Sequence, residues 1–237
     1  MLPVLDEEIV RHRIAKRIAL DLEDGAVVNL GIGIPTLVSD YVPEGRSVVT
    51  QTENGVVGAG PKPEKDDWRF IGAGGRCLSL LPGSSIVASD MSFGLIRGGH
   101  LDATVLGALE VDGKGNLANW WIPGKLVPGM GGAMDLVTGA KTVYVATTHC
   151  DKKGKSKLVK TCTLPLTGAE VTDVIVTEFC VVRKIDGVMT LCEIAPEVTV
   201  EELVAHTDMT LKIADTVLPM EGDRKSTRLN SSHGYIS

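Results

Sequence analysis

The chain has 237 residues, of which 43% are hydrophobic, 23% charged and 4% aromatic, and it contains 27 glycines. This composition excludes a disordered chain and a disulfide-stapled mini-protein, and it favours an ordered globular protein with many glycine turns. The 24 Lys and Arg against 30 Asp and Glu give a net charge of −6. Because the basic residues form no long stripe that could neutralise a run of phosphates, we expect no nucleic-acid partner.

The cysteines and histidines argue against a disulfide framework and a metal site. The five cysteines include no CxxC pair, and the five histidines have neither HxxxH nor HExxH spacing. We expect reduced, mostly buried thiols and no bound metal. No basic and apolar stretch typical of a secretory signal precedes the charged residues 6–8. No apolar run reaches the roughly 18–20 residues that span a bilayer. We therefore expect a cytoplasmic protein without membrane association.

The first elements form a βα unit. Apolar residues at helical spacing predict a helix over residues 7–24, with Gly25 as its C′ residue. Residues 26–30 predict a buried strand, which turns through Gly31 and Gly33 into a second helix over residues 36–42.

Further β-branched runs at residues 47–50, 85–89, 103–106 and 142–146 predict a mostly buried sheet. Later, residues 174–183 and 188–194 flank Asp186-Gly187, which predicts a hairpin and hence a mixed sheet. A two-residue turn there would place Cys180 opposite Glu193 and Cys192 opposite Val181, on opposite faces, so these thiols should not pair. Thr199, with Glu202 three residues later, predicts the start of a short helix.

We therefore expect an α/β fold with an open, mostly parallel but mixed central sheet flanked by helices. Residues 1–222 are expected to form one domain, because neither a linker nor a repeat interrupts them. Residues 223–237 have no periodic apolar face and are similar to translated cloning sequence. We expect this tail to be disordered and non-native.

Phosphate-binding and serine motifs are missing from the sequence. Gly31 and Gly33 lack the third glycine of a dinucleotide fingerprint, and no GxxxxGK[ST] or GxSxG motif occurs. The two glycines either form a tight turn beside a helix or contact the anionic part of a substrate. His100 either makes a hydrogen bond in a turn or at a sheet end, or it contacts a ligand.

The most informative segment is residues 51–60, Gln-Thr-Glu-Asn-Gly-Val-Val-Gly-Ala-Gly. It places the carboxylate of Glu53 just after a predicted strand, where α/β sheets present their sites. Glu-Asn-Gly is also a common turn tripeptide, so a solvated turn acid remains the alternative from these residues alone.

This segment resembles the glutamate signature of family I coenzyme A transferases, with Thr52 in place of the usual serine. Most of the chain, about residues 8–220, is similar to the B (beta) subunit of 3-oxoacid and butyrate–acetoacetate CoA-transferases. The resemblance rests on the segments at residues 29–36, 51–60, 96–102, 116–120, 122–125, 129–135 and 162–168.

The resemblance implies a CoA-transferase-like fold and a catalytic role for Glu53. This carboxylate would form a mixed anhydride and then a glutamyl-CoA thioester in a ping-pong reaction. Gly131 or Gly132 would supply the oxyanion-binding amide, or else form a packing turn before a helix over residues 134–138. Asn54 would orient Glu53 or cap the turn. The substrate would be a coenzyme A thioester, with neither a metal nor a bound redox cofactor.

The resemblance also implies transfer between succinyl-, acetyl- or butyryl-CoA and a 3-oxoacid such as acetoacetate. The A (alpha) subunit of such enzymes carries a Gly-Gly-Phe signature that this sequence lacks, so we expect a heterodimer or heterotetramer with an A subunit. Three alternatives stay open: transfer to another acid such as 3-oxoadipate or glutaconate, acyl-CoA hydrolysis, and a non-catalytic ligand-binding subunit of the same fold.

Overall fold

The computed structural model describes residues 2–72, 74–124 and 129–221. Its helices are α1 (Glu7–Asp21), the 3₁₀ helix η1 (Pro35–Tyr41), α2 (Ser89–Arg97), α3 (Ala133–Gly139) and α4 (Val200–Ala205). Its strands are β1 (Val27–Leu30), β2 (Val49–Gln51), β3 (Val56–Ala59), β4 (Leu80–Ile86), β5 (Ala103–Leu106), β6 (Glu110–Asp112), β7 (Leu117–Ala118), β8 (Thr142–Ala146), β9 (Leu158–Val159), β10 (Val174–Val176), β11 (Cys180–Ile185), β12 (Val188–Ile194) and β13 (Lys212–Pro219).

The main sheet has ten strands in the order β13-β12-β11-β10-β8-β5-β1-β2-β3-β4. The central strands β10, β8, β5, β1 and β2 are all parallel to one another, whereas β3 and β4 on one side and β11 and β12 on the other join antiparallel. This arrangement confirms the predicted open, mostly parallel and mixed sheet. A smaller sheet pairs β7, β6 and β9.

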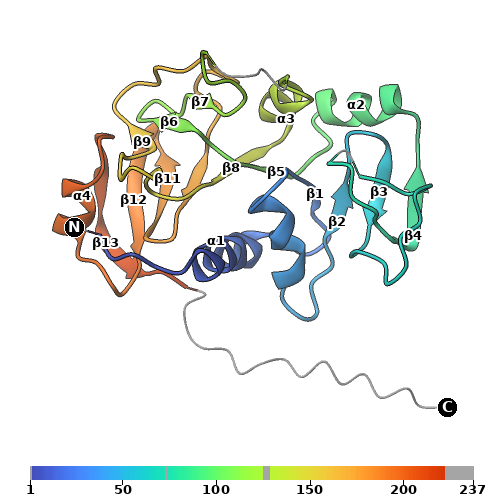
Figure 1. The fold of residues 1–237 in the computed structure, drawn as a ribbon, viewed down its shortest axis with the longest axis horizontal. Coiled ribbons are helices and arrows are strands. Elements are labelled where there is room, and N and C mark those ends of the chain that lie inside the picture. The colour runs from blue at the N-terminus through green and yellow to red at the C-terminus, as the bar shows by residue number, and fades with distance from the viewer. Residues whose placement is uncertain (1, 73, 125–128, 222–237) are drawn as a thin grey trace.

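Helices cover both faces of the sheet (Figure 1). Helix α1 packs on η1 and reaches β8 and β10, while α2 packs on α3 and α3 reaches β5. The fully buried side chains of Ile14 and Ile18 come from α1, and those of Val28, Val105 and Val145 come from the central strands. Parallel strands buried on both faces are expected to be mostly apolar, and the central strands are, apart from the buried polar residues Asn29, Gln51 and Thr104.

Helix α1 begins at the predicted residue but ends earlier than predicted. The side chain of Asp6 accepts a hydrogen bond from the Glu8 amide and caps the first turn, and Leu22 is the C-cap. The prediction that Gly25 is the C′ residue is therefore wrong. Gly25 has a φ of +80° and belongs to the following turn, which leads into β1. The second predicted helix is η1, a 3₁₀ helix with Pro35 at its first position, where the missing amide hydrogen leaves no bond unmade.

The strand predictions are most accurate at the centre of the sheet. Strands β5 and β8 have the predicted bounds, and β1 differs by one residue. The prediction of a strand over residues 85–89 is wrong, because β4 ends at Ile86 and Ser89 begins α2. The edge strands β4 and β13 are mostly exposed, so only the central part of the sheet is buried as expected.

The predicted hairpin at Asp186-Gly187 is confirmed and joins β11 to β12. The run over residues 174–183 is, however, two strands: β10 is parallel to β8, and β11 turns back against it. A β-bulge shifts the β11–β12 register, so Cys180 lies opposite Ile194 rather than Glu193. Val181 lies opposite Glu193 rather than Cys192, so this part of the prediction is also wrong. Both thiols are free, as expected.

Helix α4 has the predicted capping box, in which Thr199 and Glu202 each bond to the other's backbone amide. The predicted tail at residues 223–237 lies outside the described residues.

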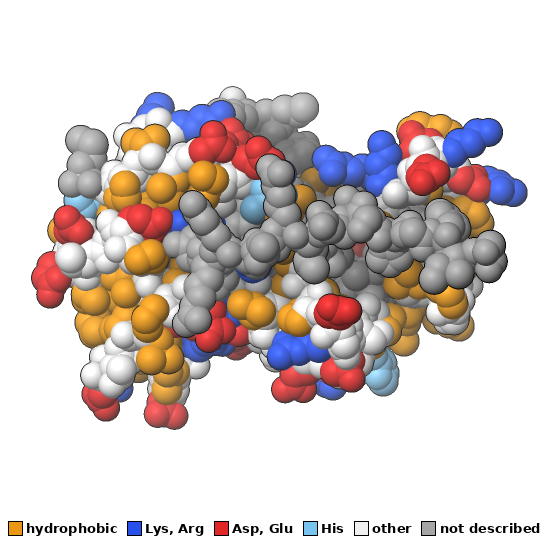
Figure 2. Space-filling view, turned by 90° about the horizontal axis from the view of Figure 1, so that it is seen from below, with side chains coloured by type: hydrophobic (Ala, Val, Ile, Leu, Met, Phe, Trp, Pro, Cys, Tyr) orange, Lys and Arg blue, Asp and Glu red, His pale blue; other side chains and the backbone are white. Residues whose placement is uncertain are grey.

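On the face seen in Figure 2, acidic and basic side chains are interspersed among apolar ones. Within the described ranges, no helix is long and apolar enough to cross a membrane.

Candidate active site

Glu53 lies in a tight turn directly after β2, at the carboxyl end of a parallel strand. The Gly55 amide donates to the Thr52 carbonyl at 3.0 Å and closes the turn over residues 52–55. Gly55 has a φ of +112°, and a Cβ there would lie 2.0 Å from the Val87 carbonyl oxygen. Only glycine fits this position, so the close contact between the turn and Val87, the residue after β4, explains why Gly55 completes the Glu-Asn-Gly segment.

The residues on either side of Glu53 anchor the turn. The Thr52 hydroxyl accepts a hydrogen bond from the Val56 amide at 3.0 Å, so the serine-to-threonine difference preserves this contact. The amide nitrogen of Asn54 donates to the Ile71 carbonyl at 2.7 Å. Asn54 thus ties the turn to the segment that precedes β4, a contact that was not among those expected from the sequence.

Gly132 meets Glu53 from a distant part of the chain. Gly132 is the N-cap residue of α3, and a Cβ built on it would lie 2.7 Å from Glu53 Cδ and 2.9 Å and 3.0 Å from the two carboxylate oxygens. The absence of a side chain at Gly132 therefore makes room for the carboxylate. Gly131 has a φ of +52° and would place its Cβ in open space, so it shapes the loop without that close approach.

Burial raises the pKa of the Glu53 carboxyl above its ordinary value. The backbone amide of Gly132 opposes this rise, and the charge of Asp135 adds to it. Asp135 lies in the first turn of α3 and pairs with Arg97 of α2, with Nε and Oδ1 2.7 Å apart. A carboxylate with a raised pKa and little hydration is a stronger base and nucleophile than a solvated one.

Gly31 and Gly33 act as turn residues in the described contacts. The Gly31 amide donates to the Val105 carbonyl at 2.8 Å, and a Cβ on Gly31 would lie 3.0 Å from that oxygen. Gly33 has a φ of +95° and precedes η1. A cavity of about 180 Å³ opens beside this loop at the carboxyl ends of β1, β5 and β8; its lining includes Ile32, Ile34, Pro35, Gly107, Ala108, Ala146, Thr147, Thr148 and Lys157.

The described part of the chain contains no group of three or more His, Cys, Asp and Glu residues that could hold a metal ion. The backbone amide of His100 donates to the Leu95 carbonyl at 3.1 Å, and its ring lies against Gly98. The two roles expected for the His100 side chain both remain predictions.

The fold and the site together define an α/β protein with a desolvated carboxylate at the carboxyl edge of its sheet, facing a backbone amide. The family model of coenzyme A transferase matches residues 11–206. The chain belongs to the coenzyme A transferase family.

Individual relatives agree with this assignment. The chain is 48% identical to the acetate CoA-transferase subunit beta of Escherichia coli K12 over 90% of its length and 98% of that protein. It is 45% identical to human mitochondrial succinyl-CoA:3-ketoacid coenzyme A transferase 2 over 91% of its length, but spans 42% of that protein. The crystal structure of an acyl-CoA transferase apoenzyme from Escherichia coli O157:H7 superposes with a TM-score of 0.72 at 21% identity, over 93% of this chain and 45% of the other.

The sequence analysis did not predict the roles of three residues near Glu53. Asp135 influences its pKa, and Gln51 and Ser92 belong to a buried hydrogen-bond chain beside the turn. Gln51 was seen only as part of the motif, and Ser92 lies in a segment where no local pattern marks a site. Their burial, at 2% and 0% exposure, is the signal that reveals them, and it exists only in the folded chain.

Proposed function

We propose that this chain is the catalytic B-type subunit of a coenzyme A transferase and that Glu53 is its nucleophile. The observation that carries the proposal is the half-buried Glu53 carboxylate held against the Gly132 backbone amide at the end of a parallel strand. Membership in the coenzyme A transferase family supports it, because moving CoA between acids requires a group that can hold the acyl or CoA unit covalently.

In the proposed reaction, a Glu53 oxygen attacks the acyl-CoA carbonyl and expels the CoA thiolate, which leaves a mixed anhydride. The thiolate then attacks the Glu53 carbonyl carbon and releases the acyl group as a free carboxylate. The enzyme is left with a glutamyl-CoA thioester, and a second carboxylic acid reverses the two steps to leave as the new acyl-CoA. Each tetrahedral intermediate carries an oxyanion, which the amide of Gly132, with that of Gly131 beside it, would stabilise.

We further propose short acids as substrates, with exchange between succinyl-, acetyl- or butyryl-CoA and a 3-oxoacid such as acetoacetate. The names of the two relatives, acetate CoA-transferase and succinyl-CoA:3-ketoacid transferase, support this class. The small cavity beside Gly31 and Gly33, lined by both apolar and polar side chains including Lys157, is the candidate place for part of the substrate.

The proposed enzyme needs a second, A-type subunit, in a heterodimer or heterotetramer. The bacterial relative is named a subunit, and the human relative is a chain of which this sequence spans only 42%. The purified single chain should therefore show no robust transfer, whereas co-expression with an A-type subunit should restore it.

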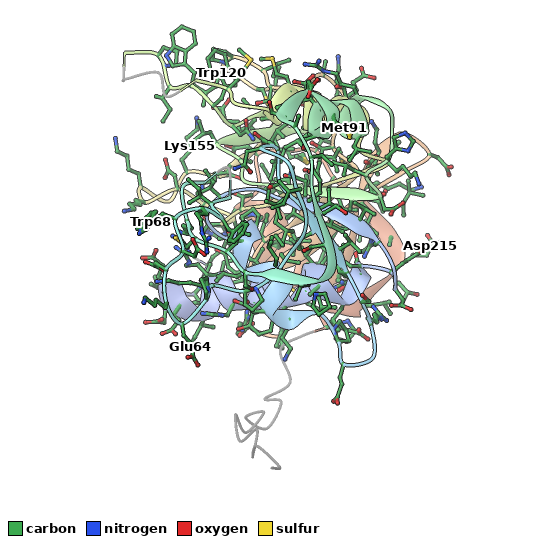
Figure 3. The ribbon with its side chains drawn as sticks, turned by 90° about the vertical axis from the view of Figure 1, so that its right-hand side faces the viewer. Glu64, Trp68, Met91, Trp120, Lys155 and Asp215 are labelled. Carbon is green, nitrogen blue, oxygen red and sulfur yellow. The ribbon has the colours of Figure 1, made fainter. Side chains whose placement is uncertain are left out.

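The test is to trap the thioester on Glu53. The assembled enzyme is incubated with an acyl-CoA and no acceptor, treated with borohydride, and digested for mass spectrometry of the peptide spanning residues 48–62. We expect an acyl-CoA-dependent modification on Glu53 and loss of activity. Glu53→Gln should give no adduct, and Glu64→Gln, which changes an exposed acid on the outer side of the molecule (Figure 3), should behave as wild type.

An adduct on another residue would refute the role of Glu53. A panel of acceptor acids, with water alone as one member, then tests the substrate class. CoA release at the same rate without any acceptor would instead indicate a hydrolase.

A further inference from the structure

A chain of buried hydrogen bonds runs from the centre of the sheet to the turn that carries Glu53. Asn29 on β1 donates from Nδ2 to the side-chain oxygen of Gln51 at 2.8 Å and to its carbonyl at 3.0 Å. Gln51, the last residue of β2, donates from Nε2 to the Ser92 hydroxyl at 2.7 Å. The Ser92 hydroxyl in turn donates to the Thr52 carbonyl at 2.9 Å. The side chains of these three donors are 4%, 2% and 0% exposed.

The end of this chain is the carbonyl of the peptide that links Thr52 to Glu53. That oxygen also accepts the Gly55 amide, the bond that closes the turn. Two donors in fixed positions determine how the peptide plane is rotated, and the plane sets the direction in which the Glu53 side chain leaves the backbone. We infer that Ser92 is a positioning residue that holds the Glu53 carboxylate in line with the Gly132 amide; this inference rests on the proposed role of Glu53.

Helix α2 suits this role because its two faces differ. Ser92 and Ile96, one turn apart, are both fully buried, whereas Met91 is 59% exposed and lies on the outer side of the helix (Figure 3). The Ser92 amide bonds to the Ala88 carbonyl within the helix, so its hydroxyl is the group that reaches out to the turn. A hydroxyl that only satisfied its own helix would bond to the preceding turn instead.

The same helix also fixes the other side of the reactive contact. Arg97 at the end of α2 pairs with Asp135 of α3, and a Cβ on Gly139 of α3 would lie 2.1 Å from the Ile96 carbonyl oxygen. These contacts lock α2 closely against α3, whose N-cap residue is Gly132. Helix α2 thus connects the backbone next to the carboxylate with the backbone that faces it.

The experiment compares Ser92→Ala with Ser89→Ala. Ser89 is exposed at the start of the same helix, so it controls for loss of a hydroxyl from α2. In single-turnover reactions of the assembled enzyme with saturating acetoacetyl-CoA, Ser92→Ala should slow Glu53 thioester formation by about 10- to 100-fold, since a misplacement near 1 Å has a cost of this size. The KM for the acyl-CoA should change by less than about twofold, because the substrate-binding groups remain in place. Ser92→Cys keeps a weak donor and should recover part of the rate.

Hydrogen exchange gives a readout that needs no activity. In the purified chain, Ser92→Ala should speed amide exchange in the peptide over residues 50–57, while Ser89→Ala should leave it unchanged. Wild-type thioester formation in Ser92→Ala, a rate loss matched by an equal rise in KM, or unchanged exchange would each overturn the inference. If the wild-type enzyme forms no thioester, the proposed function fails, and the exchange comparison still decides whether Ser92 holds the turn.

Discussion

The turn that carries Glu53 and the strand β6 that carries Glu110 both shield a carboxylate from water, but they surround it with different donors. Glu110 is 7% exposed, and it accepts hydrogen bonds from the Thr163 amide at 2.6 Å, the Thr163 hydroxyl at 2.8 Å and the Leu164 amide at 3.0 Å. Burial raises the pKa of Glu110, but these bonds outweigh it and the net shift is downward. At Glu53 burial outweighs the single amide of Gly132, and the pKa rises.

The number of donors thus separates a structural carboxylate from a reactive one. The charge of Glu110 is stabilised by fixed donors, so this residue anchors the segment at Thr163 and Leu164 and is a poor nucleophile. Glu53 is more basic than a solvated carboxylate because its surroundings do not compensate for its lost hydration. The contrast leads to four predictions, which follow from the largest expected effect to the smallest.

Glu53→Gln should abolish transfer and leave the fold intact. Loss of the nucleophile should lower kcat by about 10⁴-fold or more, as for other covalent catalysts. The free energy of unfolding should change by less than about 1 kcal/mol, since glutamine has nearly the same shape and carries no charge that must be desolvated. Steady-state assays and urea titrations measure the two effects. A variant with a tenth of wild-type activity would refute the assignment.

Gly132→Ala should act on activity and hardly on stability. The new Cβ would lie 2.7 Å from Glu53 Cδ, so the flexible carboxylate must move away from its position beside the amide. We expect kcat to fall about 100-fold, the scale of a lost oxyanion donor or a 1 Å displacement. Gly94→Ala is the matched control, because a Cβ at Gly94 meets nothing within 4 Å. Equal activity of the two variants would contradict this prediction.

Glu110→Gln should show the opposite pattern, with lower stability and normal activity of the folded enzyme. Both carboxylate oxygens of Glu110 accept hydrogen bonds, and glutamine would replace one of them with an NH₂ group that cannot accept. We expect a loss of about 2 kcal/mol of unfolding free energy at pH 7. Because the folded pKa of Glu110 is lowered, its contribution is present above the unfolded pKa of about 4.3 and is lost as the pH falls toward the folded pKa.

The difference in stability between wild type and Glu110→Gln should therefore shrink on acidification. Chemical unfolding at pH 7 and below pH 4 measures it. A difference that does not depend on pH would show that the Glu110 charge is not what anchors the segment.

Asp135→Asn should shift the pH profile of the reaction. The Asp135 charge raises the pKa of Glu53, so its removal should lower that pKa and move the acid limb of kcat/KM to lower pH, by less than about one unit. Asp90→Asn, at an exposed site on α2, should leave the limb in place. A shift toward higher pH in Asp135→Asn would contradict the electrostatic account of Glu53.

The sequence predicted the elements whose causes are local. Asp186-Gly187 has the backbone freedom for a hairpin turn, Thr199 and Glu202 form a capping box, and the central strands β5 and β8 are mostly apolar runs. The prediction failed where neighbours decide the outcome. The bulge between β11 and β12 shifted the register of Cys180, and the run over residues 85–89 was divided between an edge strand and a helix.

The sequence by itself determined that Glu53 lies in a turn after a strand, because Glu-Asn-Gly follows a β-branched run and Gly55 permits the positive φ. Only the tertiary structure decided what surrounds that carboxylate. The Gly132 amide and the Asp135 charge act on it from α3, and the Ser92 hydroxyl of α2 bonds to the Thr52 carbonyl of its turn. The packing of α2 on α3 brings them together, and burial, which raises the pKa of Glu53, is a property of that packing and of no local pattern.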